Sequence, residues 1–291
     1  MGVTVHNPYS NESLPWQKGN LHTHTTNTDG DRDPQAVVDS YASKGYGFLM
    51  ISDHDHFTDP ATLDSRGMAL IPGSEVSANG PHILHVDARR VVEPDADRER
   101  VLETIAAEGG MAIMCHPNWL EHFNHCPQEQ LEAWNSYEGI EICNGVCCIY
   151  PGSGFATDRW DRLLAEGRRV WGFANDDVHR SEHEGMAWNM VQCETREPGA
   201  IIEALRAGRF YASTGVTIDR IQVDGNRISV AAPDAHAILT YGDYQRRLAL
   251  EDGDRIEFDV DEDAAYTYVR FECWGAGLRV AWTQPFFVER A

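Results

Sequence analysis

The sequence predicts an α/β fold over its longer N-terminal part and a small antiparallel β-rich unit after it. Between about residues 20 and 212, short apolar runs alternate with amphipathic helical patterns, which is typical of parallel strands joined by crossover helices. From about Val216 onward apolar and polar residues alternate, and turn pairs such as Asp224-Gly225 separate the runs. We therefore expect two domains, residues 1–214 and residues 215–291. The chain has 291 residues, 42% of them apolar, which is enough to form both cores.

The helices are predicted from their ends as well as from their period. In residues 33–45, Asp33 is placed to cap a helix, Pro34 to occupy its first turn and Gly45 to end it. Residues 95–110 and 157–169 show the apolar spacing of amphipathic helices. These helices would lie between the strands.

The predicted strands share one feature, since each ends in His, Asp, Glu or Asn. They are residues 46–55, 68–77, 81–88, 110–118, 139–145 and 169–179. In α/β barrels and open parallel sheets, the functional site lies at the C-terminal ends of the strands. The polar residues are therefore expected to meet at one site.

Charge and composition exclude several classes of partner. The formal net charge is -22, from 46 acidic and 24 basic residues, so the surface would repel nucleic acid and anionic lipid. No apolar stretch is long enough to span a bilayer, and the N-terminus lacks the pattern of a secretory signal. Seven cysteines without a CxxC pair are expected to be small buried residues in a reducing compartment. We expect a cytoplasmic protein without nucleic-acid or membrane partners, and the oligomeric state stays open.

Histidines are concentrated in one part of the chain, with 11 of the 13 between His22 and His183. Neutral imidazoles and carboxylates are the ligands that divalent transition metals prefer. Each residue alone has a structural explanation, such as a helix cap or a surface carboxylate. Six successive segments, however, carry such groups: His22, His24 and Asp29; Asp53, His54, Asp55 and His56; Glu75; His82 and His85; His116; Asp176, Asp177 and His179.

These segments resemble the motifs of the PHP (polymerase and histidinol phosphatase) superfamily of metal-dependent hydrolases. The motifs are HxH followed by Asp, then DH, Glu, His, HP and DxH. In this chain they read "HTHTTNTD", "SDHD", "GSEVS", "PHILH", "CHPN" and "DDVH", within about residues 18–214. Two later segments, "GRFYASTG" and "AWTQPFFV", resemble the subgroup that contains carbaryl-type hydrolases (the CehA/McbA group).

The resemblance implies a distorted (β/α)7 PHP barrel that holds two or three divalent metal ions. One ion would be bound by His22, His24, Glu75 and Asp177. Glu75 would bridge to a second ion, which His116 and one histidine of "PHILH" would also bind. A third would be bound by Asp29, His54 and His179.

Strand geometry narrows some of the remaining choices. On an extended "HILHV", His82 and His85 face opposite sides, so only one can point into the site. We expect His82, with His85 as the alternative. The same alternation would put His54 and His56 on one side, with His56 near the substrate and Asp53 orienting a ligand histidine.

Other polar residues are expected around the ligands. Asn118, Asn144 and Arg180 are predicted to bind substrate or to support the ligands. For Arg180, a solvated position at the start of a helix is an equal alternative. The role of Asp176, which stands beside Asp177, stays open.

A ligand set of oxygen and imidazole suits Zn, Mn or Fe, and the sequence does not choose among them. Two ions that share Glu75 would acidify a bridging water, so that a hydroxide held at Glu75 and Asp177 could attack phosphorus or a carbonyl carbon. Three divalent ions, three carboxylates and one hydroxide sum to about +2. The site would therefore attract a small anionic molecule in spite of the acidic surface.

The favoured function is a metal-dependent hydrolase that acts as a phosphoesterase on a small phosphate ester. The alternative is a hydrolase of carboxyl esters, carbamates or amides, since few Lys or Arg residues lie near the motifs and phosphatases usually supply cationic contacts. A non-catalytic metal-binding PHP domain is less favoured, because all the ligand positions are intact.

Overall fold

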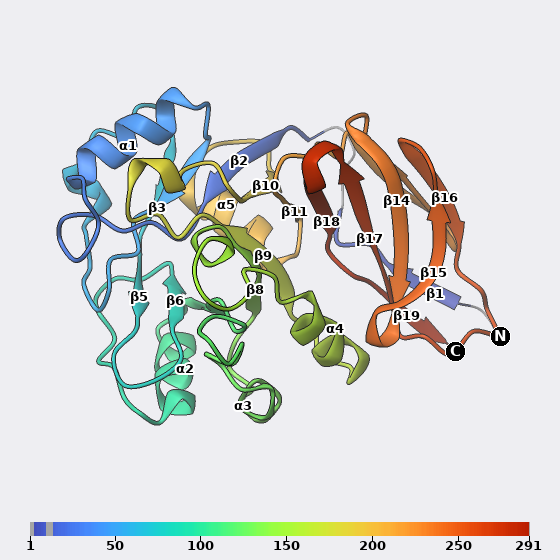
Figure 1. Cartoon of the computed structure of the whole chain (residues 1–291), viewed down its shortest axis with the longest axis horizontal. Coiled ribbons are helices and arrows are strands. Elements are labelled where there is room, and N and C mark those ends of the chain that lie inside the picture. Colours follow the sequence, from blue (N-terminus) through green and yellow to red (C-terminus); the bar gives the residue numbers. More distant parts are fainter. Residues whose placement is uncertain (1–2, 10–13, 291) are drawn as a thin grey trace.

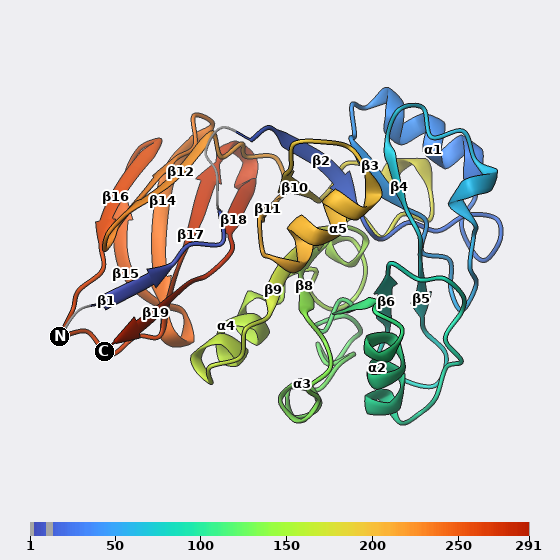
Figure 2. The same ribbon diagram turned by 180° about the vertical axis from the view of Figure 1, so that it is seen from behind.

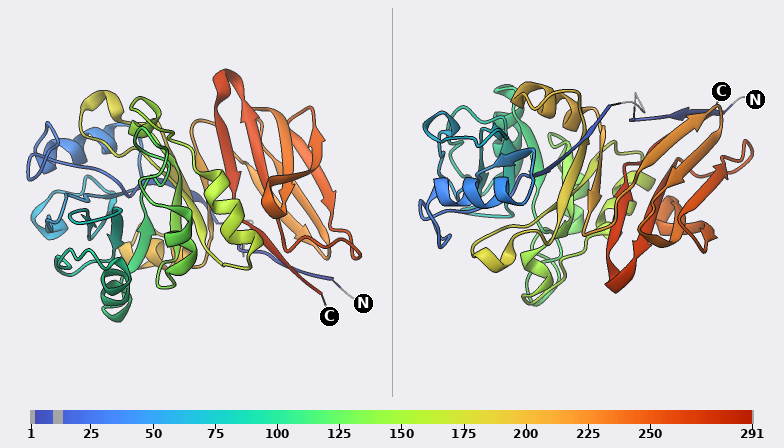
Figure 3. Two further views of the ribbon diagram at one scale, coloured as in Figure 1. Left: turned by 60° about the horizontal axis from the view of Figure 1, so that its bottom comes forward. Right: turned by 90° about the horizontal axis from the view of Figure 1, so that it is seen from above.

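Two regions make up the protein in the computed structural model, which describes residues 3–9 and 14–290. Figure 1 shows an α/β region beside a β-rich region, with helix α4 (Thr157–Ala165) between them. Both termini lie at the outer edge of the β-rich region, as Figure 3 shows from two further directions. The mixed α/β class predicted from the sequence is confirmed.

The α/β region contains parts of two sheets. In one, β2 (Trp16–Asn20), β3 (Phe48–Met50) and β4 (Ala69–Ile71) are parallel neighbours, and β10 (Trp188–Gln192) and β11 (Phe210–Ser213) continue the sheet beyond β2 in antiparallel fashion. The other has the order β5-β6-β7-β8-β9. Its strands are β5 (Gly73–Val76), β6 (Ile83–Val86), β7 (Met111–Met114), β8 (Gly139–Asn144) and β9 (Trp171–Asn175).

The two sheets meet at one end of the region. A parallel bridge pairs Thr23, just after β2, with Val178, just after β9. A second parallel bridge pairs His54, just after β3, with Glu75 in β5. These two bridges bring the ends of β2, β3, β5 and β9 together, which is where the predicted ligands stand.

The alternating pattern predicted parallel strands throughout this region, but the strands of the structure are not all parallel. Residues 68–77 form two strands, β4 and β5, rather than one, and β6 runs antiparallel to both β5 and β7. The short connection of residues 77–82 explains the antiparallel pairing of β5 with β6, because parallel neighbours need a crossover of about a dozen residues or more.

Helices cover the outer faces of these sheets. The predicted helices are confirmed as α1 (Pro34–Ser43), α2 (Arg98–Ala107) and α4, and Asp33 caps α1 by accepting a hydrogen bond from Ala36 N. Figure 2 shows α5 (Pro198–Arg206) on the opposite side from α1. The remaining helices are α3 (Gln128–Ala133) and the short 3-10 turns η1 (Pro60–Thr62), η2 (Val146–Cys148), η3 (Ser181–His183), η4 (Asp243–Gln245) and η5 (Ala276–Leu278). Among the described residues, none of the helices combines the length and the apolar character that crossing a membrane requires.

The β-rich region is antiparallel, in line with the alternating pattern of its sequence. A three-stranded sheet contains β12 (Arg220–Asp224), β13 (Arg227–Ala231) and β16 (Arg255–Asp259). Facing it are β14 (Ala235–Gly242), β15 (Arg246–Glu251), β17 (Tyr268–Gly275), β18 (Val280–Thr283) and β19 (Phe286–Arg290). The first strand, β1 (Val3–His6), pairs with β19, and β18 pairs with β11, so the sheet is continuous with the α/β region.

Candidate metal centre

All nine predicted ligand residues lie in one cluster at the strand ends. Most come from loops that directly follow a strand, so the short strands determine where these side chains begin. The nine are His22, His24 and Asp29 after β2, His54 after β3, Glu75 in β5, His82 before β6, His116 after β7, and Asp177 and His179 after β9.

The innermost group contains two histidines and two carboxylates. His22 Nε2 lies 3.3 Å from Glu75 Oε1 and 3.2 Å from Asp177 Oδ1. His24 Nε2 lies 3.2 Å from the same Asp177 oxygen and 3.5 Å from Glu75 Oε2. All four side chains are buried. The ligand atoms of His22, His24 and Asp177 lie within 4.8 Å of one another and could hold a metal ion.

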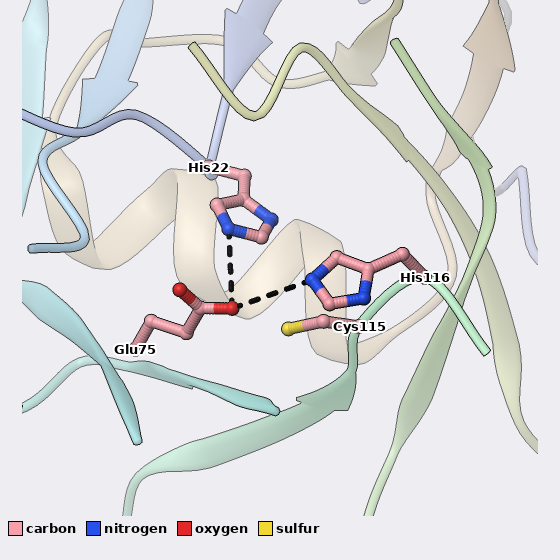
Figure 4. Close-up of side chains that lie close together, drawn as sticks. All are labelled: His22, Glu75, Cys115 and His116. Atoms are coloured by element: carbon pink, nitrogen blue, oxygen red, sulfur yellow. Dashed lines mark ion pairs between the residues drawn. The ribbon is translucent and has the colours of Figure 1, made fainter. Parts of the chain in front are cut away.

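A second group shares the carboxylate of Glu75. Figure 4 shows His22 and His116 pointing from different strands toward the same oxygen of Glu75. The distance from His116 Nε2 to Glu75 Oε1 is 3.6 Å, and that from His82 Nδ1 to the same oxygen is 2.9 Å. Glu75 is therefore placed between the two groups, as a bridging ligand would be.

A third group surrounds the carboxylate of Asp29. His179 Nε2 lies 3.3 Å and His54 Nε2 3.5 Å from Asp29 Oδ2. His54 Nδ1 lies 2.7 Å from Glu75 Oε2, which links this group to the other two. His24 completes the group, whose ligand atoms lie within 4.8 Å of one another.

The charges of the cluster stabilise one another. Burial opposes ionisation of Glu75 and Asp177, but the adjacent histidines, His22 foremost, hold the pKa of both carboxyls well below the usual range. Burial also opposes protonation of His54, yet its contacts with Asp29 and Glu75 raise its pKa to about 10. These carboxylates therefore favour positive charge at the positions of the ring nitrogens, and a divalent cation would supply such charge.

The residues fit a metal ion by a second criterion as well. Buried polar atoms in proteins are nearly always hydrogen-bonded. In the part of the chain that the structure describes, several buried atoms of this cluster form no hydrogen bond, although some lie at ion-pair distance from a neighbour: His22 Nε2, both ring nitrogens of His24, His54 Nδ1, Glu75 Oε2 and His116 Nδ1. Most of them face the interior of the cluster, where imidazole nitrogens and carboxylate oxygens form the donor set of a divalent transition metal.

Glu141 supports the cluster, and our sequence analysis did not single it out. Glu141 Oε1 lies 2.8 Å from His22 Nδ1, and Oε2 accepts hydrogen bonds from His116 N and Asn144 Nδ2, each at 2.9 Å. Because His22 Nδ1 donates to this carboxylate, Nε2 keeps its lone pair for the centre of the cluster. A carboxylate within the apolar strand "GIEICNG" was the signal available, since a buried charge needs partners.

Two further groups beside the cluster were also missed. His125 lies next to His82 and His116, and burial and the charge of His116 lower the pKa of His125 to about 2. Cys115 Sγ lies within 4.8 Å of the ligand atoms of His22, Glu75 and His116 (Figure 4). Burial raises the pKa of this thiol well above its usual range, so it stays protonated. Neither residue has a sequence signal beyond its closeness to His116.

The structure separates the two histidines of "PHILH". His82 faces Glu75, whereas His85 is fully buried. A Cβ at Gly110 would come within 2.3 Å of the His85 ring, so glycine at that position leaves room for it. His82 stands directly before β6 and His85 within it, and the two side chains face different surroundings, as the predicted alternation requires.

Asp53 does not orient a ligand histidine, and that prediction is wrong. Its carboxylate accepts hydrogen bonds from Thr25 N and Oγ1, Thr28 Oγ1 and Thr58 Oγ1, at 2.6–3.0 Å. These bonds hold the loop of residues 25–31, so Asp53 positions Asp29 through the backbone.

His56 is exposed and is not among the described residues that line the cavity at the cluster, so its place beside the substrate stays a prediction. Asp55 has φ of 48°, so the chain is not extended here and the strand alternation on which the prediction relied does not apply. Asn118 is also turned away from the cluster, because it hydrogen-bonds Phe155 O, Asp158 and Arg159.

Adjacent carboxylates after β9 have different functions. Asp176 accepts hydrogen bonds from Tyr41 Oη and from the backbone of residues 185–187. Asp177 points instead into the cluster, where Asn144 Nδ2 lies 3.2 Å from it. The φ of 58° at Asp177 turns the chain between the two side chains, and such strain is typical of functional sites.

A cavity of about 300 Å³ opens onto the cluster. Arg180, which is exposed, is the one Lys or Arg among the described residues that line it. The lining residues are Asp29, His54, His82, His116, Trp119, Val146, Cys147, Tyr150, Asp177, His179 and Arg180.

Comparison with solved structures gives the fold. The chain is similar to a two-domain protein from Bacteroides vulgatus that contains a predicted PHP-like metal-dependent phosphoesterase, with 16% identity, 94% of each chain covered and a TM-score of 0.50. More distant similarity is found to the lesion-specific endonuclease EndoQ of Pyrococcus furiosus (13% identity, 78% of this chain and 62% of that chain, TM-score 0.48). It is also found to an amidohydrolase from Chromobacterium violaceum (15% identity, 56% and 88%, TM-score 0.43).

No protein-family model matches the sequence, and no curated protein matches it. At 16% identity, the likeness to the two-domain protein concerns the fold alone. The chain thus shares the architecture of a protein with a PHP-like domain, and its chemistry has to be argued from its own residues.

Proposed function

We propose that the protein is a PHP-type metal-dependent hydrolase, most similar to the carbaryl-type group, and that it acts on a small phosphate ester. The observation that carries this proposal is the convergence of nine ligand side chains with unpartnered buried atoms at one cavity. The two bridges between the sheets support the further proposal that β2, β3 and β5–β9 correspond to the distorted (β/α)7 barrel.

The ligands would be divided as the three groups suggest. His22, His24, Glu75 and Asp177 would bind one metal ion, His82 and His116 would join Glu75 at a second, and Asp29, His54 and His179 would bind a third. Zn, Mn and Fe all accept such ligands. When bound, the metal ions would lower the pKa of a coordinated water and polarise the substrate.

The other residues of the site act by holding these side chains in place. Glu141 keeps His22 in the tautomer whose Nε2 faces Glu75 and Asp177. His179 Nδ1 donates to Asp177 O at 2.9 Å, which leaves its Nε2 to face Asp29. Asp53 holds the Asp29 loop through three threonines. A site for several metal ions needs this support, because hydrogen bonds from surrounding residues keep each ligand side chain in the orientation that metal binding requires.

A second candidate is a hydrolase of carboxyl esters, carbamates or amides that uses the same metal ligands. The cavity lining favours it, since Arg180 is its single cationic side chain among the described residues, while Trp119, Val146 and Tyr150 are apolar or aromatic. Phosphate esters are usually held by several cationic groups, so metal ions would have to replace them here.

The test compares 4-nitrophenyl phosphate with 4-nitrophenyl acetate, with Mn or Zn added and metal content measured. Metal-dependent phosphate turnover that His24→Ala abolishes supports the phosphoesterase. The matched control is His236→Ala, an exposed histidine of β14. Turnover of the acetate alone selects the second candidate, and bound metal without any turnover selects a non-catalytic domain.

A further inference from the structure

Cys115 is a buried thiol inside the candidate metal centre, and the proposed function does not use it. It stands directly after β7 and next to the ligand His116. Its Sγ lies within 4.8 Å of the ligand atoms of His22, Glu75 and His116 (Figure 4). Among the described residues it is the one cysteine that belongs to a group of three or more side chains able to hold a metal ion. The other cysteines therefore offer matched comparisons.

The backbone at the end of β7 explains why two adjacent side chains face the cluster. Consecutive residues of a strand point to opposite sides, so Cys115 and His116 would not share a site if the chain stayed extended. His116 has φ of 26°, which ends the extended geometry. Hydrogen bonds hold the turn, since Cys115 N donates to His82 O at 3.0 Å and His116 N to Glu141 Oε2 at 2.9 Å. Both side chains are therefore fixed where they can bind the same ion.

The spacing of the neighbouring ligand atoms suits a tetrahedral ion. Two zinc bonds of about 2.1 Å at a tetrahedral angle place their ligand atoms about 3.4 Å apart. Glu75 Oε1 and His116 Nε2 are separated by 3.6 Å, close to this value. Cys115 Sγ lies within 4.8 Å of the ligand atoms of both residues. An ion between the oxygen and the nitrogen would therefore have the sulfur beside it, and a zinc–sulfur bond is longer, at about 2.3 Å.

Neighbouring atoms point to a bound ion independently of the thiol. His22 Nε2, Glu75 Oε2 and His116 Nδ1 are buried and form no hydrogen bond with the described residues. Burial alone would not distinguish Cys115, because Cys273 of β17 is buried among core residues as well. The difference is that Cys115 also has imidazole and carboxylate ligand atoms beside its sulfur. Cys115 is therefore a candidate ligand rather than a core residue only.

Cys115 would reach the ion from the side that faces away from the substrate. The cavity of about 300 Å³ is lined by His82, His116 and Asp177, whereas Cys115 is not among the described residues that line it. A sulfur ligand on the inner side would leave the cavity side of the ion open. Catalytic metal sites need such an open position for water and substrate.

We propose that Cys115 is a thiolate ligand of the metal ion at Glu75 and His116, and that it makes this position select zinc over manganese. The proposal rests on the metal binding of the proposed hydrolase. On binding, the sulfur–hydrogen bond breaks, a sulfur–metal bond forms and the proton passes to solvent. Thiolate is a soft ligand that suits zinc, whereas manganese prefers oxygen ligands. The sulfur would thus narrow the choice that histidines and carboxylates alone leave open.

The test uses Co²⁺ as a spectroscopic substitute for zinc in the whole chain. One equivalent is added to the metal-free protein, and sulfur-to-cobalt charge-transfer absorption is recorded in the near ultraviolet. We expect this band in the wild type and its loss in Cys115→Ser. Cys147→Ser and Cys273→Ser should keep it, since Cys147 is the cysteine that lines the cavity and Cys273 is buried in β17. Cobalt bound without the band, or a band that survives Cys115→Ser, overturns the proposal.

A second measurement needs no substitution, so it decides the matter even if Cys115→Ser fails to fold. X-ray absorption of the wild type with one equivalent of zinc should show a sulfur neighbour at about 2.3 Å beside nitrogen and oxygen at about 2.0 Å. A shell of nitrogen and oxygen alone overturns the proposal.

Metal competition tests the selectivity. The ratio of zinc affinity to manganese affinity should fall in Cys115→Ser and stay at the wild-type value in Cys273→Ser. An unchanged ratio in Cys115→Ser overturns the proposed role in metal choice.

The outcomes separate this proposal from the proposed function. A metal–sulfur bond without turnover of any ester supports Cys115 as a ligand and contradicts the hydrolase. Metal-dependent turnover with a shell of nitrogen and oxygen alone supports the hydrolase and overturns the role of Cys115. A protein that binds neither cobalt nor zinc contradicts both.

Discussion

Two clusters of buried charge lie in this protein, and they differ in whether their atoms have partners. One surrounds Arg270, where α4 of the α/β region meets β17 of the β-rich region. The other is the candidate metal centre. Both contain carboxylates that are almost entirely removed from solvent. Removing charge from water is costly unless the charge is paired, so each cluster has to be balanced by some partner.

The Arg270 cluster balances itself. The guanidinium donates two hydrogen bonds to Asp161, at 2.7 and 2.6 Å, and one to Glu272 at 2.7 Å. Tyr268 Oη donates to Asp161 and Trp274 Nε1 to Glu272. None of the side-chain atoms of Arg270, Asp161 and Glu272 is among the buried, unpartnered atoms of the described residues.

The metal-ligand cluster is balanced only in part. Its carboxylates face imidazoles rather than a permanent cation, and several of its buried atoms have no hydrogen-bond partner within the described residues. Buried charge by itself therefore does not indicate a binding site. Buried atoms of metal-ligand type without hydrogen bonds distinguish the candidate metal centre from the Arg270 cluster, and four predictions test this distinction.

The largest effect on stability is expected for Arg270→Ala. It would leave Asp161 and Glu272 buried without a cation, which costs about 3–5 kcal/mol of unfolding free energy. Urea unfolding measures the loss. The triple variant Arg270→Met, Asp161→Leu, Glu272→Leu should recover much of the stability, and a triple variant no more stable than the single one would contradict this explanation.

Added metal should stabilise the protein against unfolding by binding at the metal-ligand cluster and not at the Arg270 cluster. At a free metal concentration of about 100 times the dissociation constant, the unfolding free energy should rise by about 2.7 kcal/mol. Thermal unfolding with Zn or Mn, against the chelated protein, measures the rise. His24→Ala should abolish or greatly reduce it, whereas His236→Ala should retain it. Equal stability with and without metal would contradict the distinction between the Arg270 cluster and the metal-ligand cluster.

Glu141→Gln should weaken metal binding without unfolding the protein. Residues that orient a metal-ligating histidine typically contribute about 10–100-fold to metal affinity or activity. Metal titration at constant pH measures this, and circular dichroism checks the fold. The matched control is Glu203→Gln, an exposed carboxylate that pairs with Arg209. Unchanged metal affinity in Glu141→Gln would show that His22 is oriented by other contacts.

The smallest effect is expected for Arg227→Ala. Arg227 forms hydrogen bonds with Asp259 at 2.7 and 2.9 Å, but both side chains are exposed. Exposed ion pairs contribute little to stability because water and salt screen them. Urea unfolding should therefore not distinguish this variant from the wild type. A loss comparable to that of Arg270→Ala would mean that geometry rather than burial determines the strength of these pairs.

Features that depend on neighbouring residues could be predicted from the sequence. The start of α1 follows from the Asp33 cap and Pro34, because capping involves groups within one turn. The candidate ligands could be chosen from the sequence because they stand in six short motifs that resemble those of the PHP superfamily. Strand alternation, which is a local property, predicts that only one histidine of "PHILH" faces the site, and the family resemblance favoured His82, which lies beside Glu75.

Which distant segments meet depends on the packing of the whole chain and could not be predicted from local patterns. The bond from His22 to Glu141 and the bridge between Trp119 and Gly152 join residues that are far apart in the sequence. The strand alternation assumed for His56 does not apply, because one left-handed residue, Asp55, ends it. Hydrophobic pattern and capping act within a few residues, whereas pairing direction, burial of charge and cavity shape depend on how the whole chain packs.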